Sequence, residues 1–285
     1  MRPDEVKTRR KLLSSTSIGA HFSLAKMHLK TVNPDLEDRM PVYQKFARVY
    51  DKIGSDQFSK RMFRYTQQLL TRLRYHPRSV LDLACGTGTA AVMWAESGLL
   101  TYGIDGSQQM LDMAERKARA GGVTVSFSRQ PLTSFRMPQR VDLVTCYYDS
   151  VNYLLSLADL TACFAGVRRA LYDGGYFIFD VNTPEAMKVL WGSQVYADET
   201  DDVAWIWKNC YFPRLNRAEI RATFYVRHGD KWERFEETHA ERGYGVRDIS
   251  KTLKAAGLKP VYLFDCLTFN RPDRRTLRLA VVAQK

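Results

Sequence analysis

The sequence lacks any apolar run of the length that a membrane-spanning helix requires, which is about 20 residues. Its first residues carry basic and hydroxyl side chains, without the apolar segment that forms the core of a secretory signal. Cysteine is scarce, with five in 285 residues, and no two cysteines stand in a C-x-x-C pair. These absences predict a cytoplasmic protein with reduced thiols, no metal site and no membrane partner.

The sequence also shows no Ser/His/Asp set of the kind that hydrolases use, and it has only five histidines. What it has is a composition typical of a packed globular chain, with 45% hydrophobic and 12% aromatic residues. The formal net charge is +12, but the basic excess lies before residue 78 and after residue 182. A basic N-terminal region can contact phosphate, so a nucleic-acid partner stays open without being favoured over a solvated basic surface.

The most informative stretch is Val80–Ala91, VLDLACGTGTAA. A short apolar run breaks at Gly86 and Gly88 and passes into a helical pattern, which predicts a strand, a tight turn and a helix. Glycines let a ligand lie against the backbone, so the turn suits a nucleotide-like cofactor. Gly86, Gly88 and Ala91 also have the G-x-G-x-x-A spacing of dinucleotide sites, with Asp105 downstream, so spacing alone leaves two cofactors open.

Asp82, an acid inside the apolar strand, separates these alternatives, because a buried acid is costly without a partner and can pair with a cationic ligand. The run Asp82-x-x-Cys85-Gly86-Thr87-Gly88 resembles the first motif of the class I S-adenosylmethionine-dependent methyltransferases. The resemblance implies that S-adenosylmethionine is the cofactor, that Asp82 and the turn hold its amino-acid end, and that Asp105 binds the ribose hydroxyls. The further cofactor-binding residues that we expect are Tyr50, Ala84, Cys85, Gly86, Gly88, Gly106, Met110, Gln130, Pro131, Leu132 and Tyr147.

The chain around this motif alternates between strand and helix patterns. Two helices are predicted between residues 43 and 73, and strands at 80–83, 100–104, 123–127, 141–147 and 176–181. A helix at 246–256 and strands at 260–264 and 277–283 close the chain. We expect an α/β fold with a doubly wound seven-stranded sheet whose final strand is antiparallel, as in the methyltransferases that the first motif resembles.

A different pattern occupies residues 196–241, where three alternating runs appear at 202–211, 218–228 and 231–241. They predict a small antiparallel β insertion, and it resembles the insertion of the glycine and amino-sugar N-methyltransferases, which covers the substrate pocket. We therefore expect a basic N-terminal extension at 1–42, a methyltransferase core at 43–195 and 242–285, and an inserted β flap at 196–241.

Candidates for the chemistry lie after the fourth strand and in the insertion. Methyl transfer needs mainly an oriented, dry nucleophile, and a base is optional. As catalytic candidates we take Tyr148, Asp149 and His239, and as substrate-binding candidates Asn152, Asn182, Trp205 and Arg242. Four of them have a structural alternative: capping for Asp149 and Asn152, an apolar flap face for Trp205, and a buried structural role for His239. Asp180 is expected to brace a loop.

The third strand departs from the family pattern, because Arg129-Gln130-Pro131 stands where relatives usually carry an acid that contacts adenine. Adenine would then depend on backbone amides and apolar walls. The function predicted is methyl transfer from S-adenosylmethionine to a nitrogen or oxygen atom of a small molecule. An RNA methyltransferase of the same fold and a cofactor-binding partner without turnover are the alternatives.

Overall fold

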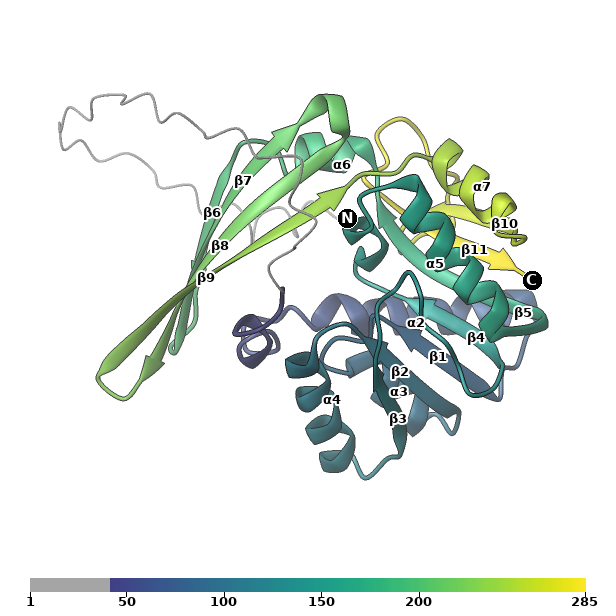
Figure 1. The fold of residues 1–285 in the computed structure, drawn as a ribbon, viewed down its shortest axis with the longest axis horizontal. Helices are drawn as coiled ribbons and strands as arrows, with labels where there is room; N and C mark the ends of the chain where they lie inside the picture. Colours follow the sequence, from purple (N-terminus) through teal and green to yellow (C-terminus); the bar gives the residue numbers. More distant parts are fainter. Residues whose placement is uncertain (1–41) are drawn as a thin grey trace. The chain divides into compact units, whose positions relative to one another are not determined.

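The computed structural model describes residues 42–285, and its main element is a seven-stranded sheet (Figure 1). The strands follow the order β10-β11-β5-β4-β1-β2-β3. Their bounds are Ser79–Leu83 (β1), Leu100–Asp105 (β2), Val125–Arg129 (β3), Val141–Cys146 (β4), Leu171–Asn182 (β5), Lys259–Asp265 (β10) and Arg278–Gln284 (β11). The predicted extension falls almost wholly outside the described residues.

Strands β1 to β5 pair in parallel, and β11 pairs antiparallel with both β5 and β10. This confirms the predicted doubly wound sheet with an antiparallel final strand. The chain leaves β1 toward β2 and β3 and then returns to place β4 on the other side of β1. Because the strand order reverses there, the carboxyl ends of β1 and β4 flank the position where such sheets bind ligands.

Helices cover both faces of this sheet. They are Gln57–Leu73 (α2), Thr89–Glu96 (α3), Gln108–Ala120 (α4), Leu157–Ala170 (α5), Pro184–Val189 (α6) and Val246–Ala255 (α7). Short 3₁₀ turns occur at Phe46–Arg48 (η1), Ser150–Tyr153 (η2) and Pro213–Leu215 (η3). Ser107, Ser156 and Thr183 cap their helices by accepting a backbone N–H, as hydroxyl side chains at this position do.

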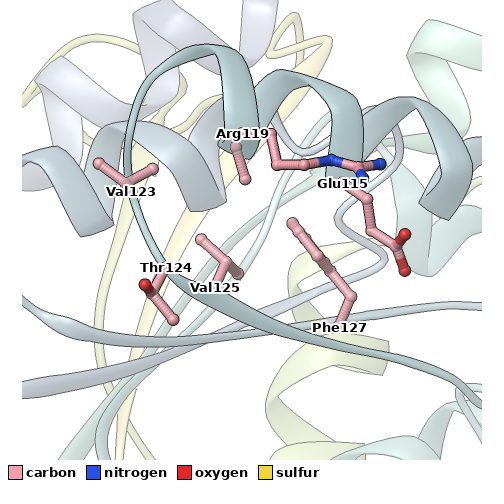
Figure 2. Close-up of a pocket in the computed structure, with 7 residues that line it drawn as sticks. Glu115, Arg119, Val123, Thr124, Val125 and Phe127 are labelled. Atoms are coloured by element: carbon pink, nitrogen blue, oxygen red, sulfur yellow. The ribbon is translucent and has the colours of Figure 1, made fainter.

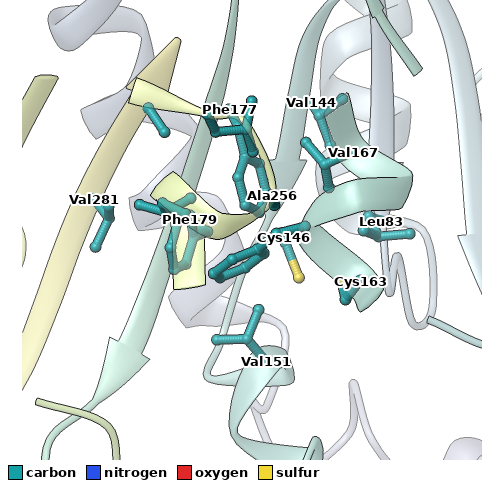
Figure 3. Close-up of a cluster of buried hydrophobic side chains, with 14 of the residues drawn as sticks. Leu83, Val144, Cys146, Val151, Cys163, Val167, Phe177, Phe179, Ala256 and Val281 are labelled. Carbon is teal, nitrogen blue, oxygen red and sulfur yellow. The ribbon is translucent and has the colours of Figure 1, made fainter. Parts of the chain in front are cut away.

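The alternation of side chains along β11 decides how the core divides. Leu279, Val281 and Ala283 pack with α5 and α7 on one face, whereas Ala280 and Val282 pack with α2 and α3 on the other. The first face is rich in phenylalanine, and the rings of Phe177 and Phe179 stack with centroids 4.4 Å apart (Figure 3). A strand buried on both faces in this way cannot slip by one residue, so the register of the sheet is fixed.

A second sheet is separate and antiparallel, with the order β6-β7-β8-β9 (Figure 1). Its strands are Val195–Glu199 (β6), Val203–Phe212 (β7), Arg217–His228 (β8) and Lys231–Arg242 (β9). The three predicted runs are thus found within one or two residues. Strand β6 was not expected, because it is short, polar and mostly exposed and so carries no clear alternation.

The prediction of two helices before β1 is wrong for the first of them. Only the 3₁₀ turn η1 forms there, between Tyr43 with φ 60° and Gly54 with φ 74°. The backbone amides of Tyr43, Lys45 and Phe46 donate to the Glu237 carboxylate, which holds this segment against β9. Helix α2 forms as predicted. Among residues 42–285, no helix combines the length and apolar character needed to cross a membrane.

Candidate active site

The glycine turn after β1 is held by hydrogen bonds within the protein. Ala84, Gly86 and Gly88 all have positive φ, between 54° and 76°. The Gly86 amide donates to Asp105 Oδ2 at 2.9 Å, and the Gly88 amide donates to the carbonyl of Cys85 at 2.9 Å. These two amides are therefore not available to a phosphate, which favours a cofactor without phosphates at this turn.

The two glycines of the turn differ in what surrounds them. A Cβ added at Gly86 meets no atom within 4 Å, and the same holds at Gly106 after β2. A Cβ at Gly88 would lie 2.7 Å from Ala114 Cβ of α4. Gly86 and Gly106 thus border open space that a ligand can fill, whereas Gly88 permits close packing between α3 and α4.

Asp105, at the carboxyl end of β2, is half-buried and its two oxygens accept from different backbone amides. Oδ2 accepts from Gly86, and Oδ1 accepts from Ser107 at 2.8 Å. Burial raises the pKa of Asp105, while these amides lower it. The Gly106 amide also hydrogen-bonds to the carboxylate, and the acceptor capacity that remains suits a neighbouring hydroxyl, as a ribose presents.

Asp82, in β1, is only 2% exposed and is satisfied inside the protein. Its Oδ1 accepts from the Thr145 hydroxyl at 2.8 Å, and the Ala91 amide in the first turn of α3 also hydrogen-bonds to it. Burial raises its pKa from 3.8 to about 7. The positive end of α3 is therefore compensated by this carboxyl group, which again argues against a phosphate there.

The expected adenine side lies at the end of β3. Gly106, Arg129, Gln130 and Pro131 line a hollow of about 410 Å³. The Gln130 carboxamide is engaged with Ser128 and the backbone of Arg136. A second hollow, between α4 and β3, is lined by Glu115, Arg119, Val125 and Phe127 among others (Figure 2) and lies at the opposite end of β3.

The glycine turn is also tied to the segment that precedes α2. Thr87 donates its hydroxyl to Asp51 Oδ1 at 2.7 Å, and Lys117 of α4 lies 2.8 Å from Asp51 Oδ2. Lys117 also donates to the hydroxyls of Thr87 and Thr89. Tyr50, beside Asp51, packs against Phe46 with ring centroids 5.3 Å apart. These contacts hold residues 43–56 beside the glycine turn.

Strand β4 ends in a tight loop whose backbone is held by Asp180 of β5. Tyr148 and Asp149 both have positive φ, and their amides donate to the two oxygens of Asp180 at 2.7 and 2.9 Å. Arg278, at the start of β11, bridges Asp180 and Asp149 with two contacts of 2.6 Å. Its guanidinium also lies over the Phe58 ring, 4.4 Å from the centroid. The expectation that Asp180 braces a loop is met by this geometry.

Asn182 ends β5 beside the same loop and contacts two acids. Its Nδ2 donates to Asp149 Oδ2 at 2.7 Å and to Glu241 Oε2 at 3.3 Å. Asn152 accepts from the Asn182 amide and donates to the carbonyls of Asn182 and Arg242. Every hydrogen-bonding group of the Asn152 carboxamide is thereby used within the protein, and it joins η2 to β5 and β9.

His239 of β9 lies at the end of a chain of hydroxyl groups. The Tyr43 and Tyr153 hydroxyls are 2.6 Å apart, and Tyr153 lies 3.0 Å from His239 Nδ1. Burial lowers the pKa of His239 to about 4, so the ring is neutral at pH 7. Its Nε2 has no hydrogen-bond partner in the described part of the chain, and Glu237 Oε2 lies 3.6 Å away.

Comparison with known proteins gives the family. Residues 80–175 match the family described as "Methyltransferase domain". A protein of Geobacillus sp. (strain WCH70) that is named as a methyltransferase is 31% identical over 246 residues, which are 85% of this chain and 99% of the relative. A crystal structure of an S-adenosylmethionine-dependent methyltransferase from Clostridium acetobutylicum ATCC 824 is 31% identical, covers 86% of this chain and 99% of its own, and gives a TM-score of 0.77.

This chain belongs to the class I S-adenosylmethionine-dependent methyltransferases. The fold is also shared with the sugar N-methyltransferase KedS8 from Streptoalloteichus sp. ATCC 53650, which is 21% identical, covers 96% of this chain and 99% of its own, and gives a TM-score of 0.67. The predicted cofactor, S-adenosylmethionine, is thereby confirmed.

The methyltransferase has residues that fit this cofactor. Open space at Gly86 and Gly106, the two accepting oxygens of Asp105 and the internally compensated N-terminus of α3 suit a sulfonium nucleoside without phosphates. S-adenosylmethionine, when bound, supplies an electrophilic methyl group on a positively charged sulfur. The protein's part is to orient the acceptor, keep water out and manage its proton.

Several predicted residues of the methyltransferase have structural roles in this arrangement. The Tyr147 hydroxyl donates to Thr66 inside the core, and burial raises the pKa of the Cys85 thiol, so it is protonated at neutral pH. Arg242 donates to the carbonyl of Leu155. Trp205 packs against the apolar cluster around Phe224. Met110 is buried in α4, and Leu132 is partly buried against the core.

Sequence reasoning missed three charged residues of the methyltransferase site. Arg278 belongs to no motif, and only the pairing of β11 with β5 brings it beside Asp149 and Asp180. Glu241 lies at the end of an alternating run and belongs to no motif, and only the fold buries it beside Asn182. Lys117 lies in the predicted helix α4, but no residue near it in the sequence indicates a contact with Asp51.

Proposed function

We propose that this methyltransferase transfers the methyl group to a nitrogen or oxygen atom of a small molecule. The observation that carries the proposal is the burial of the polar groups at the ends of β4, β5 and β9. Asp149, Asn182, His239 and Glu241 are all buried, so an acceptor that contacts them must be enclosed by the protein, which suits a small molecule.

Cofactor roles follow from the contacts above. Asp105 would accept the ribose hydroxyls, and Gly86 and Gly106 would lie against the nucleoside. Asp82 would act on the cationic end of the cofactor through its charge, since Thr145 and Ala91 already bind its oxygens. Gly106, Gln130, Pro131 and Leu132 would border adenine through backbone and apolar contacts.

The four-stranded sheet would serve as the predicted flap over the acceptor. Support comes from Glu237, which binds three amides of residues 43–46, and from His239, which contacts Tyr153 of η2. Strand β9 thus links the flap both to the segment beside the glycine turn and to the loop after β4. The division at residues 195 and 242 fits the bounds of β6 and β9.

The test is formation of S-adenosylhomocysteine with three classes of acceptor: small amines, small hydroxyl compounds and RNA. Turnover with one of the small-molecule classes is expected. Turnover with RNA alone, accompanied by binding that weakens steeply with added salt, would replace the proposal with the RNA methyltransferase. Binding of S-adenosylmethionine without turnover in any class would overturn it.

A further inference from the structure

Three buried acids meet one buried guanidinium at the ends of β4, β5 and β9. Asp149 and Asp180 each contact Arg278 at 2.6 Å. Glu241 is 3% exposed and forms no ion pair with any residue between 42 and 285, and its hydrogen-bond donor is Asn182 Nδ2 at 3.3 Å. An acid buried without a cation is costly, so this group calls for a positively charged or proton-sharing partner.

Asn182 provides an independent indication of a ligand. Its side chain is fully buried, and its Nδ2 contacts both Asp149 and Glu241. Its Oδ1 has no hydrogen-bond partner among the described residues. Buried carboxamide oxygens are normally satisfied, so an N–H or O–H donor is missing beside Glu241.

The surroundings of Glu241 contain aromatic hydroxyl groups and no second cation that the structure describes. The phenols of Tyr43 and Tyr153 lie close enough to Glu241 to interact with its charge, and the phenol of Tyr50 lies close enough to interact with that of Asp149. Phenol rings beside buried acids suit an ammonium group, which binds to carboxylates and to ring faces alike. Within residues 42–285, no three acid, histidine or cysteine side chains are grouped as metal ligands would be.

We propose that the acceptor is an aliphatic amine whose N–H groups bind Asn182 Oδ1 and Glu241, and that Glu241 takes the proton which the nitrogen must lose before methylation. This inference rests on the proposed small-molecule function and narrows it to nitrogen. An alcohol carries no positive charge, so it cannot supply the cation that the buried Glu241 lacks, whereas an ammonium supplies both the charge and the N–H groups.

The proton and the electrons balance in this step. An ammonium group passes one proton to the Glu241 carboxylate and becomes a neutral amine with a lone pair. That lone pair forms the new N–CH₃ bond, and the S–CH₃ bond breaks with its electron pair going to sulfur. The products are a methylated ammonium and the neutral thioether S-adenosylhomocysteine.

The acidity of Glu241 suits this role. Burial and the neighbouring Asp149 raise the pKa of Glu241 well above its ordinary value of 4.5, while Arg278 lowers it. The raised pKa of this carboxyl group is closer to the pKa of an alkylammonium, so transfer of a proton from the ammonium to the carboxylate is less unfavourable. Binding of an ammonium stabilises the ionised carboxylate, so it lowers this raised pKa and shifts a proton from Glu241 to solvent.

The experiment uses the full chain saturated with S-adenosylhomocysteine. Cyclohexylamine and the linear alkylamines from ethyl to hexyl are titrated by calorimetry against their matched alcohols, in two buffers of different ionisation heat. We expect an amine to bind about 10- to 100-fold more tightly than its alcohol and to release protons on binding, which the alcohol should not do. Glu241→Gln should lose both the preference and the proton release, while S-adenosylmethionine affinity is unchanged.

Glu236→Gln is the matched control, because Glu236 lies on the same strand with an exposed side chain. It should behave as the unmodified protein does, and a melting curve shows whether Glu241→Gln is folded. Equal binding of amines and alcohols, no binding of any amine, or an unchanged proton release in Glu241→Gln would overturn the inference. Turnover of hydroxyl acceptors in that case would leave the proposed function standing, whereas no turnover in either class would remove both.

Discussion

The backbone amide of Gly86 donates a hydrogen bond of 2.9 Å to Oδ2 of Asp105, and this contact joins the glycine turn after β1 to the carboxyl end of β2. The turn and the acid are 19 residues apart in the sequence. Because the amide fixes the orientation of the carboxylate, a ligand that hydrogen-bonds to Asp105 meets a preorganised acceptor.

Replacement of Asp105 should weaken binding of the cofactor. Asp105→Asn keeps the size of the side chain but loses the charge that strengthens hydrogen bonds from ribose hydroxyls, so S-adenosylmethionine affinity should fall about 10- to 100-fold by calorimetry. Asp112→Asn, on the exposed face of α4, is the control and should leave the affinity unchanged. Undiminished affinity in Asp105→Asn would contradict the ribose role.

Asp82 should make both cofactor affinity and stability depend on pH, in opposite directions. Its pKa is raised in the folded protein from 3.8 to about 7, so it stabilises the fold below about pH 4, and this contribution is lost as pH rises through 7. The cationic cofactor is attracted only once Asp82 is ionised. Affinity should therefore rise between about pH 6 and about pH 8.

The check is a series of calorimetric titrations and melting curves over this range. Asp82→Asn accepts the same hydrogen bond from Thr145 but does not titrate, so its affinity for the cofactor should be flatter with pH. Its melting temperature should also fall less between about pH 4 and about pH 7. If affinity and melting temperature change with pH in the same way in the unmodified protein and in Asp82→Asn, another group is responsible for the pH dependence.

The two glycines of the turn should respond differently to alanine. In Gly86→Ala the added methyl group meets no protein atom, so stability falls only by the cost of an alanine with positive φ, about 1 to 2 kcal/mol. The methyl group occupies the cofactor side, so cofactor affinity should fall. Gly88→Ala adds a 2.7 Å clash with Ala114 and should destabilise the fold more. Gly98→Ala has a similar φ and open space away from the site, so it controls for backbone cost.

Denaturant unfolding and cofactor titration of these three variants separate the effects. Gly86→Ala and Gly98→Ala should lose similar stability, with the loss of affinity confined to the former. Equal cofactor affinity in these two variants would show that the ligand does not lie against Gly86. A Gly88→Ala protein as stable as Gly98→Ala would contradict the packing role of Gly88.

Removal of Arg278 should strongly destabilise the methyltransferase. Arg278→Met leaves Asp149 and Asp180 buried without their cation, which costs about 3 to 5 kcal/mol in comparable pairs. When Asp180→Asn is added to Arg278→Met, part of the lost free energy of unfolding should be restored, because one uncompensated charge is removed. Denaturant unfolding measures both, and additive losses in the double variant would contradict the coupling.

Local chemistry explains which features were predictable. The glycines of the run 82–88 take positive φ and so form the turn without contacts from distant residues. The Ser107 hydroxyl caps α4 by accepting from the backbone amide three residues later. Strand β3 begins two residues later than predicted, at Val125. The helix expected near residue 50 is limited to the turn η1, because Tyr43 and Gly54 have positive φ, and the contact of this segment with Glu237, nearly 200 residues away, is not visible in the sequence.

The sequence by itself determined the sheet and the glycine turn, since each depends on periodicity or on residues close along the chain, and the resemblance of residues 82–88 to a family motif gave the cofactor class. Only the tertiary structure decided that Arg278 lies between Asp149 and Asp180, that Asn182 Oδ1 has no partner among the described residues, and that Glu241 is buried beside it. These pairs are brought together by the closing of β11 on β5 and of β9 on the loop after β4. Their energies depend on burial, which no pattern of neighbouring residues records.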